Sequence, residues 1–147
     1  MKKILSIVGA RPQFIKAFIT IKSINKEKKK YKNILLHTGQ HFDTQMSEIF
    51  FKELQFSKNL IKIHLVKKKD RISRLSEMLF KIKKSVEKIS PDLIIVYGDT
   101  DSTLAGSIIA KRLNIRLMHI EAGLRSHVTE MPEEQNRVFS DYLSDYL

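Results

Sequence analysis

The chain has 147 residues, a length typical of one domain that buries roughly two-thirds of its unfolded surface in a single core. It contains 42% hydrophobic and 29% charged residues, no cysteine, and a formal net charge of +11. The absence of cysteine excludes disulfides and thiolate metal sites, and no apolar run approaches the roughly twenty residues that a membrane span needs. The N-terminus does not resemble a signal peptide, so we expect a cytoplasmic protein.

Much of the positive charge lies in two runs, KEKKKYK at 26–32 and VKKKDR at 66–71. Runs of this kind attract anions and nucleic acids. These contain little arginine and one aromatic residue, Tyr31, so they lack the stacking surface of a single-strand binding site. We interpret them as solvated surface lysines and do not expect a nucleic-acid partner.

The first half of the chain predicts three strands and two helices. The apolar run 3–8 predicts a buried strand that ends at Gly9, and apolar residues at helical spacing predict a helix over 14–24. A second strand is expected at 33–38 and a short third one at 60–66. Between them Asp43 is a suitable N-cap for a helix, whose inner face would carry Met46, Ile49, Phe50 and Leu54.

The second half continues the alternation of helices and strands. A long helix is expected over about 72–89, with one apolar face that begins at Ile72. The run LIIVYG at 93–98 predicts a buried strand, and Asp101 or Ser102 is expected to cap the helix after it. A strand at 115–120 precedes the last helix, and Pro132 suits the first position of that helix.

Strands that alternate with helices in this way are typical of an α/β fold with right-handed crossovers. The strands are continuously apolar, which indicates a sheet covered on both faces. The sequence therefore predicts a Rossmann-like parallel sheet with helices on both faces, and residues 1–147 are expected to form a single domain of this kind.

Polar residues follow four of the five predicted strands. Because ligands in such sheets bind at the carboxyl ends of the strands, we expect these residues to lie together. They are Arg11 and Lys16 after the first strand, Gln40, His41 and Asp43 after the second, Asp99, Thr100 and Asp101 after the fourth, and Glu121 and Arg125 after the fifth.

Several of these residues also have an ordinary structural explanation. Asp101 is of a type that caps helices, whereas Asp99 lies one step earlier and a cap does not explain it. Glu133 and Glu134 suit the first turn of a helix, and Glu133 could pair with Arg137 one turn later. The residues alone leave these alternatives open.

The absence of two common nucleotide-binding motifs and of metal-ligand spacing excludes several classes of ligand site. The first loop reads GARPQF, which is neither the GxGxxG of dinucleotide-binding folds nor a phosphate-binding P-loop. The histidines have no spacing typical of metal ligands, so we expect no metal site.

Five motifs occur in one order: GARPQFIK at 9–16, TGQHFD at 38–43, VYGDTDSTLAG at 96–106, HIEAGLRS at 119–126 and MPEEQNR at 131–137. Together they resemble the N-terminal domain of the non-hydrolysing UDP-N-acetylglucosamine 2-epimerases, and the resemblance covers residues 3–147. It implies one half of a two-domain fold similar to the GT-B glycosyltransferases, with the active site in the cleft between the domains. It also implies interconversion of UDP-GlcNAc and UDP-ManNAc for surface polysaccharides, with a UDP-sugar as ligand and no cofactor.

The chemistry of the family assigns roles to the motif residues. Its members remove the proton on carbon 2 of the sugar and expel UDP, which forms 2-acetamidoglucal, and UDP then adds back with the opposite configuration at that carbon. The catalytic carboxylates of the family correspond to Asp99, Glu121 and Glu133. The residues expected to bind substrate are Arg11, Lys16, Gln40, His41, Thr100 and Arg125, of which the two in the first loop and helix would balance the diphosphate charge.

The chain departs from the family pattern at a few positions. The usual GTRPE is GARPQ, so Gln13 stands in place of a glutamate and Ala10 in place of a threonine. HVTE at 127–130 replaces a stretch that commonly carries Phe-Asp and a basic residue. Asp43 stands where some bacterial members have a glutamine of a regulatory site, so we do not extend that regulation to this chain.

The C-terminal sequence SDYLSDYL carries no glycine or proline that would end a helix, so the last helix is expected to run to the end of the chain. Its apolar stripe would favour a homodimer or another association. The second domain of the family, with its uridine pocket and a catalytic histidine, has no counterpart in these residues. We therefore expect a truncated chain that is inactive alone. The apolar stripe of the last helix consists of Phe139, Tyr142, Leu143, Tyr146 and Leu147.

Three hypotheses remain at this point. The chain is half of an epimerase that acts with a C-terminal half, or a folded remnant of a split or degraded epimerase gene without catalysis, or a basic module that binds nucleotides or nucleic acid. The third predicts strongly salt-dependent binding to polynucleotides.

Overall fold

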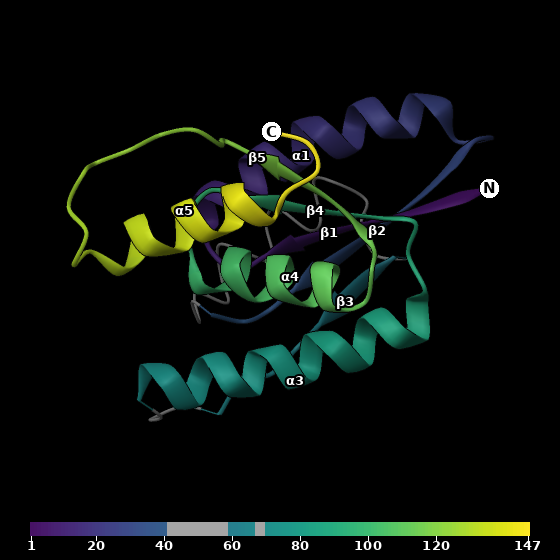
Figure 1. Cartoon of the computed structure of the whole chain (residues 1–147). Coiled ribbons are helices and arrows are strands. Elements are labelled where there is room, and N and C mark those ends of the chain that lie inside the picture. Colours follow the sequence, from purple (N-terminus) through teal and green to yellow (C-terminus); the bar gives the residue numbers. More distant parts are fainter. Residues whose placement is uncertain (41–58, 67–69) are drawn as a thin grey trace.

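The computed structural model describes residues 1–40, 59–66 and 70–147, and strands and helices alternate along most of them (Figure 1). A 3-10 turn, Asn25–Glu27, follows the first helix. In chain order the elements are β1 (Lys2–Val8), α1 (Arg11–Ile24), β2 (Tyr31–His37), β3 (Leu60–Lys62), α3 (Arg71–Ile89), β4 (Leu93–Tyr97), α4 (Asp101–Arg112), β5 (Arg116–Ile120) and α5 (Pro132–Leu143).

The strands form one parallel sheet in the order β3-β2-β1-β4-β5. The chain builds outwards from β1 through β2 to β3, and then crosses back to place β4 on the other side of β1. This reversal of strand order lies between β1 and β4, and ligands of open α/β sheets bind at the carboxyl ends of the strands next to such a reversal. The predicted α/β fold is confirmed.

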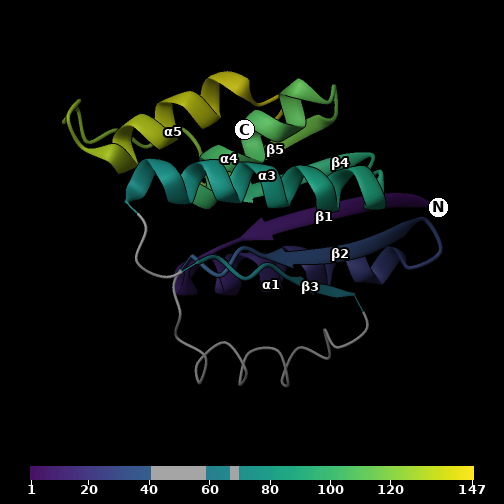
Figure 2. The same cartoon turned by 90° about the horizontal axis from the view of Figure 1, so that it is seen from below.

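Helices cover both faces of the sheet. In Figure 2, α3 and α4 lie on one side of it and α1 on the other. Apolar residues of the strands alternate between the two sides: Leu5 and Ile7 pack against α3 and α4, whereas Ile4 and Val8 pack against α1. Both faces are therefore buried, which explains why the strands are continuously apolar in sequence.

Helix α5 lies beside α4 at the β5 edge, and its polar residues face inwards. Glu134, Asn136, Ser140 and Asp141 are buried, whereas the side chain of Tyr142 is 86% exposed. This arrangement is the reverse of an ordinary amphipathic helix. It arises because α5 contributes hydrogen bonds to the carboxyl edge of the sheet.

Three local predictions are wrong. Ile72 is 80% exposed, because it lies in the first turn of α3, and the fully buried side of that helix begins at Met78. The N-cap of α4 is Thr100, whose hydroxyl accepts from the amide of Thr103, while Asp101 is already helical. Helix α5 ends at Leu143, because Ser144 is extended and the residues after it pair with β5.

The other boundaries agree with the predicted elements to within a few residues. The exception is β3, which is limited to Leu60–Lys62 rather than 60–66. The helix predicted after Asp43 lies outside the described residues. Within the described residues no helix is both long enough and apolar enough to cross a membrane.

Candidate functional site

The loops after β1, β4 and β5 meet at the carboxyl edge of the sheet, and the side chain of Gln13 joins the first two. Gln13 is buried at the start of α1. Its Oε1 accepts from the amides of Gly9 at 2.6 Å and Ala10 at 3.1 Å. Its Nε2 donates to the carbonyl of Tyr97 at 2.5 Å and faces the hydroxyl of Thr100 at 2.9 Å. The amide therefore fixes the β1–α1 loop against the β4–α4 turn.

A second group of polar side chains brings the loop after β2 against α4. The Thr38 and Ser102 hydroxyls lie 2.7 Å apart, and both side chains are buried. The Oε1 atom of Gln40 accepts from the backbone amide of Ser102 at 3.0 Å and from its hydroxyl at 2.6 Å. Arg74 of α3 donates to the Gln40 carbonyl at 2.7 Å. Three strand ends are thus held around the start of α4.

Glu121 follows β5 directly and forms an ion pair with Lys16 of α1. Its backbone has a φ of +71°, a left-handed conformation that is uncommon for a residue other than glycine. Such a conformation costs about 1 kcal/mol or more and is concentrated at functional sites. The turn aims the carboxylate of Glu121 across the sheet edge, towards the helix that follows β1.

Asp99 follows β4 and forms an ion pair with Arg137 of α5. The guanidinium of Arg137 also bonds Glu134 at 2.6 Å, one turn earlier in the same helix. Asn136 donates to the Asp99 carbonyl at 3.0 Å. The predicted pairing of Arg137 with Glu133 is wrong, because the inward face of α5 carries Glu134 instead.

The carboxylate of Glu134 accepts hydrogen bonds from the loop that precedes α5. Its carboxylate accepts from the backbone amides of Ser126 at 3.0 Å and His127 at 3.2 Å. These hydrogen bonds hold the pKa of Glu134 below its ordinary value. The carboxylate of Glu134 therefore serves to fix the 121–131 loop and the guanidinium of Arg137.

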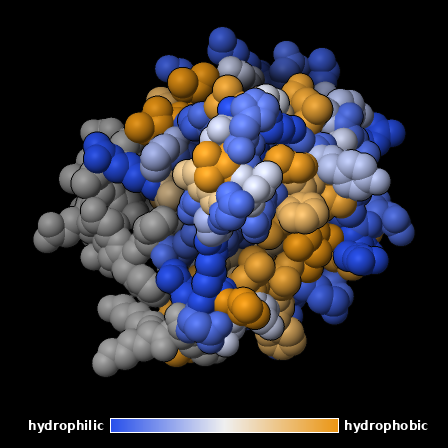
Figure 3. All heavy atoms as spheres, turned by 60° about the vertical axis from the view of Figure 1, so that its left-hand side comes forward, coloured by the Kyte–Doolittle hydropathy of each residue, from blue (hydrophilic) through white to orange (hydrophobic). Residues whose placement is uncertain are grey.

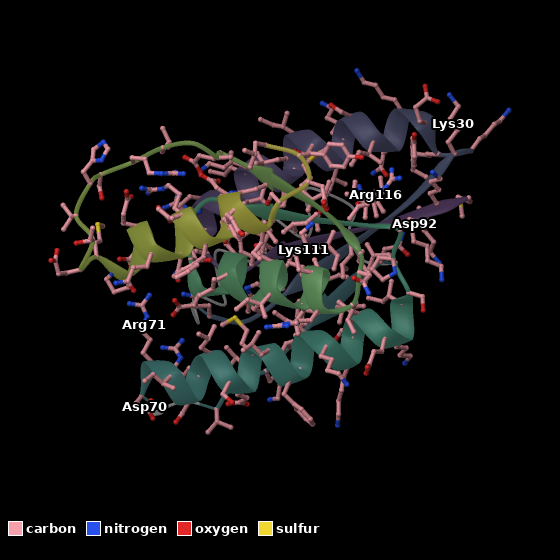
Figure 4. All side chains as sticks on the ribbon, viewed as in Figure 1. Lys30, Asp70, Arg71, Asp92, Lys111 and Arg116 are labelled. Carbon is pink, nitrogen blue, oxygen red and sulfur yellow. The ribbon has the colours of Figure 1, made fainter. Side chains whose placement is uncertain are left out.

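Asp101 connects α4 to α3 and α5. It accepts from Arg71 at 2.7 Å and from Asn136 at 3.0 Å, and Figure 4 shows Arg71 at the start of α3. Burial alone would raise the pKa of Asp101, but the hydrogen bonds from Arg71 and Asn136 lower it overall. The hydrogen bond that Arg71 donates to Asp101 is the largest cause that raises the pKa of Arg71, against the effect of burial. The charge of Glu133 adds a smaller contribution in the same direction, so Glu133 lies near this group.

The structure brings most of the predicted site residues together, but it gives several of them partners within the chain. Asp99, Glu121, Lys16 and Gln40 lie at the carboxyl edge. Arg125 is held by Asp141 of α5 at 2.6 Å, so its charge is already balanced. Among the other predicted residues, Thr100 is the cap of α4, Arg11 is exposed in the first turn of α1, Glu133 is half-buried at the start of α5, and His41 lies outside the described residues.

Five residues of this edge were not predicted as site residues. The clearest sequence signal belonged to Arg137, which ends the MPEEQNR motif and lies one turn after the acidic pair. Gln13, His119 and Asn136 also stand in the quoted motifs, but their bonds to segments far away in the sequence appear only in the tertiary structure. The five are Gln13, His119, Asn136, Arg137 and Asp141.

The surface at this end of the molecule mixes hydrophilic residues with patches of hydrophobic ones (Figure 3). Exposed apolar side chains there belong to the 121–131 loop and to the outer face of α5. In the part of the chain that the structure describes, no group of three or more His, Asp or Glu side chains could hold a metal ion. The exposed apolar residues are Leu124, Val128, Met131, Val138, Phe139 and Tyr142.

Known proteins share both the sequence and the fold. A family model described as UDP-N-acetylglucosamine 2-epimerase matches residues 22–147. The UDP-N-acetylglucosamine 2-epimerase of Methanococcus maripaludis is 40% identical over 147 residues, which cover 100% of this chain and 39% of that protein. The chain belongs to the UDP-N-acetylglucosamine 2-epimerase family. The predicted resemblance is confirmed.

Two further relatives extend the comparison. The UDP-2,3-diacetamido-2,3-dideoxy-D-glucuronate 2-epimerase of Pseudomonas aeruginosa is 48% identical over 147 residues, covering 99% of this chain and 40% of that protein. The crystal structure of Methanocaldococcus jannaschii UDP-GlcNAc 2-epimerase in complex with UDP-GlcNAc and UDP matches with a TM-score of 0.89 at 37% identity, covering 100% of this chain and 40% of that chain. The chain thus spans about 40% of the length of the relatives it matches and corresponds to one domain of their GT-B-like fold.

Proposed function

We propose that this chain forms one wall of the active site of a 2-epimerase that acts on a UDP-linked 2-acetamido sugar, converting UDP-GlcNAc to UDP-ManNAc. The observation that carries the proposal is the pair of carboxylates at the carboxyl edge, Asp99 after β4 and Glu121 after β5. Each of them is held by a cation from a different helix, Arg137 and Lys16. Family membership and the place of this edge in the fold support the same assignment.

The reaction requires groups that remove and return a proton. In the first half the proton on carbon 2 goes to a base, the bond between carbon 1 and the diphosphate oxygen breaks, and UDP leaves with the bonding electrons. In the second half 2-acetamidoglucal receives a proton on the opposite face of carbon 2, and UDP adds back to carbon 1. Asp99, Glu121 and Glu133 are the carboxylates that we assign to these proton transfers.

The diphosphate would be bound by side-chain cations rather than by the amino end of α1. The amides of Gly9 and Ala10 already donate to Gln13, so they are not free for a phosphate. We assign this role to Arg11, which is exposed, and to Lys16, which would exchange Glu121 for the diphosphate.

We assign further substrate contacts to Gln40, His41, Thr100 and Arg125. The backbone and side-chain donors of Ser102 already bond the Gln40 oxygen, which leaves the amide hydrogens of Gln40 for a ligand. The guanidinium of Arg125 would have to bind the substrate while it also pairs with Asp141.

The relatives extend over more than twice the length of this chain, so we propose that further polypeptide supplies the opposite wall of the cleft. On this proposal the 147 residues alone do not turn over substrate. The exposed apolar face of α5 is a suitable contact surface for that polypeptide or for a second copy of the chain. Sedimentation of the chain alone would distinguish the two, because a second copy gives a dimer without any added partner.

A UDP-2,3-diacetamido uronate is a second candidate substrate. The 48% identity to the Pseudomonas aeruginosa 2-epimerase that is named for such a substrate favours it. The uronate carries a carboxylate that GlcNAc lacks. Both substrates undergo the same proton transfer at carbon 2, so the roles of the carboxylates do not change.

A chimera tests the proposal directly. Residues 1–147 would replace the matching part of Methanocaldococcus jannaschii UDP-GlcNAc 2-epimerase, to which the chain is 37% identical. We expect the chimera to epimerise one of the two UDP-sugars and to incorporate deuterium from D₂O at carbon 2. A folded chimera that converts neither substrate would contradict the proposal.

Variants of the chimera separate the carboxylates from a general loss of charge. Asp99→Asn and Glu121→Gln should each lower kcat by about 100-fold or more, since positioned acids and bases contribute about 10²–10⁴-fold. Glu133→Gln is expected to act in the same direction. Glu130→Gln is the matched control, because Glu130 is an exposed loop residue close to the same helix. An equal loss in all four variants would rule out the assignment.

A further inference from the structure

The side chain of His119 in β5 is enclosed between two oxygen acceptors. Its ring is fully buried. Its Nε2 lies 2.6 Å from the carbonyl oxygen of Gly98, and its Nδ1 lies 2.6 Å from Oδ1 of Asp141. A backbone carbonyl can only accept, so the hydrogen of the first bond belongs to Nε2. The ring therefore bridges the end of β4 to the inward face of α5.

Gly98 is the residue directly before Asp99, and residues of β5 bond both its backbone amide and its carbonyl. The Gly98 amide donates to the carbonyl of Ile120 at 3.0 Å, and the Gly98 carbonyl accepts from His119. Gly98 has a φ of +63°, and a Cβ at this position would lie 3.3 Å from Oε2 of Glu121. The turn that carries Asp99 is thus fitted closely against the turn that carries Glu121.

Asp141 anchors the other end of the bridge. Its second oxygen accepts from the amide of Gly123 at 3.0 Å and pairs with Arg125 at 2.6 Å. Burial alone would raise the pKa of Asp141, but the hydrogen bonds from Arg125, Gly123 and His119 lower it overall, so the carboxylate stays ionised. One carboxylate of α5 therefore holds both the His119 ring and the segment that follows Glu121.

We propose that His119 is a positioning residue, which fixes the Gly98 peptide and thereby sets the carboxylate of Asp99 relative to Glu121. A histidine that only filled the core would need no particular acceptor, whereas this ring bonds the one peptide that leads into Asp99. The positioning is a property of the chain itself, and its effect on catalysis rests on the proposed function. A misplacement of about 1 Å in a catalytic group can cost about 100-fold in rate.

Two amide variants of His119 isolate the bond to Gly98. The side-chain nitrogen of glutamine reaches the position of Nε2, and that of asparagine reaches the position of Nδ1. His119→Gln therefore keeps the donor to Gly98, whereas His119→Asn keeps a group opposite Asp141 and loses that donor. Both replacements are neutral amides, so they form a matched pair.

The first measurement uses the 147-residue chain and needs no activity. The ¹⁵N chemical shift of the Asp99 amide reports hydrogen bonding to the carbonyl of the same peptide group. We expect this shift to be kept in His119→Gln and displaced in His119→Asn. In the unmodified chain a slowly exchanging Nε2 hydrogen of His119 should show a nuclear Overhauser effect to the Asp99 amide, so that the bond can be observed even where a variant does not fold. Equal displacement in both variants, or absence of the slowly exchanging hydrogen, would overturn the proposal.

The second measurement uses the chimera. His119→Gln is expected to keep kcat within about tenfold, and His119→Asn to lower kcat by about 100-fold with KM nearly unchanged. Equal losses in kcat for the two variants would show a structural role only. If the unmodified chimera does not epimerise any UDP-sugar, the proposed function fails, and the measurement on the chain alone still decides whether His119 positions Asp99.

Discussion

Replacing Gln13 by methionine tests whether one side-chain amide joins the loops that form the site. Methionine has nearly the same length and shape as glutamine, so Gln13→Met keeps the packing and removes only the polar atoms. Gln13 is 3% exposed, and water cannot easily take the place of its amide. The variant therefore isolates the hydrogen bonds of the amide.

The size of the effect follows from the partners that would be left without an acceptor or donor. The amides of Gly9 and Ala10 both donate to Oε1 of Gln13. The Tyr97 carbonyl keeps another donor, the Thr103 hydroxyl at 2.6 Å, so it adds little. A buried donor without a partner costs about 1–3 kcal/mol, and two of them give an expected loss of about 2–6 kcal/mol in the free energy of unfolding. The free energy of unfolding of a typical domain is only about 5–15 kcal/mol.

Urea denaturation followed by circular dichroism measures this loss. Gln135→Met is the matched control, because the exposed amide of Gln135 also donates to a backbone carbonyl, that of Thr129, at 2.8 Å. We expect the control to change the free energy of unfolding by less than about 0.5 kcal/mol. If Gln13→Met were no more destabilising than the control, the amide would not join the two loops as argued.

Three further predictions concern stability and can be checked by the same denaturation experiment. Gly98→Ala should cost about 1–2 kcal/mol because of its left-handed backbone, and an unchanged midpoint would contradict that conformation in solution. Arg137→Met leaves Asp99 and Glu134 without their shared guanidinium and should cost about 1–3 kcal/mol, whereas the exposed Arg116→Met should not. Burial, with smaller effects from the charges of Lys62 and His64, lowers the pKa of His37 to about 4. The unfolded chain therefore binds this proton first, and stability should fall as the pH drops from about 6.5 towards about 4, by at most about 3 kcal/mol. His37→Gln should remove this slope, and an equal slope in both proteins would assign it to other groups.

The location of the candidate site could be predicted from the sequence because strand ends are a local property. The apolar run that forms β4 ends at Tyr97, and Asp99 follows it within two residues. In a parallel sheet every such strand end falls on the same edge, so the sequence also predicted that Lys16 and Glu121 lie near each other. In the structure they form an ion pair. The pairing partners on α5 could not be predicted in the same way. Arg137 reaches Asp99 across 38 residues of chain, and helical periodicity indicates only which residues share a face.

The errors have a common physical cause. The last helix was expected to run to the end of the chain, but the residues after Leu143 pair with β5, so α5 ends there. The cap of α4 was assigned to Asp101 or Ser102 by residue type, yet the carboxylate of Asp101 bonds Arg71 and Asn136, and the hydroxyl of Ser102 bonds Gln40. Thr100 then caps the helix. Competition between partners decides such positions, and the partners come from distant segments.

The sequence by itself determined the α/β class, the elements of the described sheet and the family, because apolar periodicity and strand-end motifs are local patterns. Only the tertiary structure decided how the carboxylates are held. It showed that Gln13 occupies the amides at the start of α1, that Glu121 takes a left-handed turn towards Lys16, and that His119 bonds the peptide before Asp99. The contacts of Glu121 and His119 join residues 21 to 105 positions apart, and their geometry is set by the packing of strands and helices rather than by any neighbouring residue.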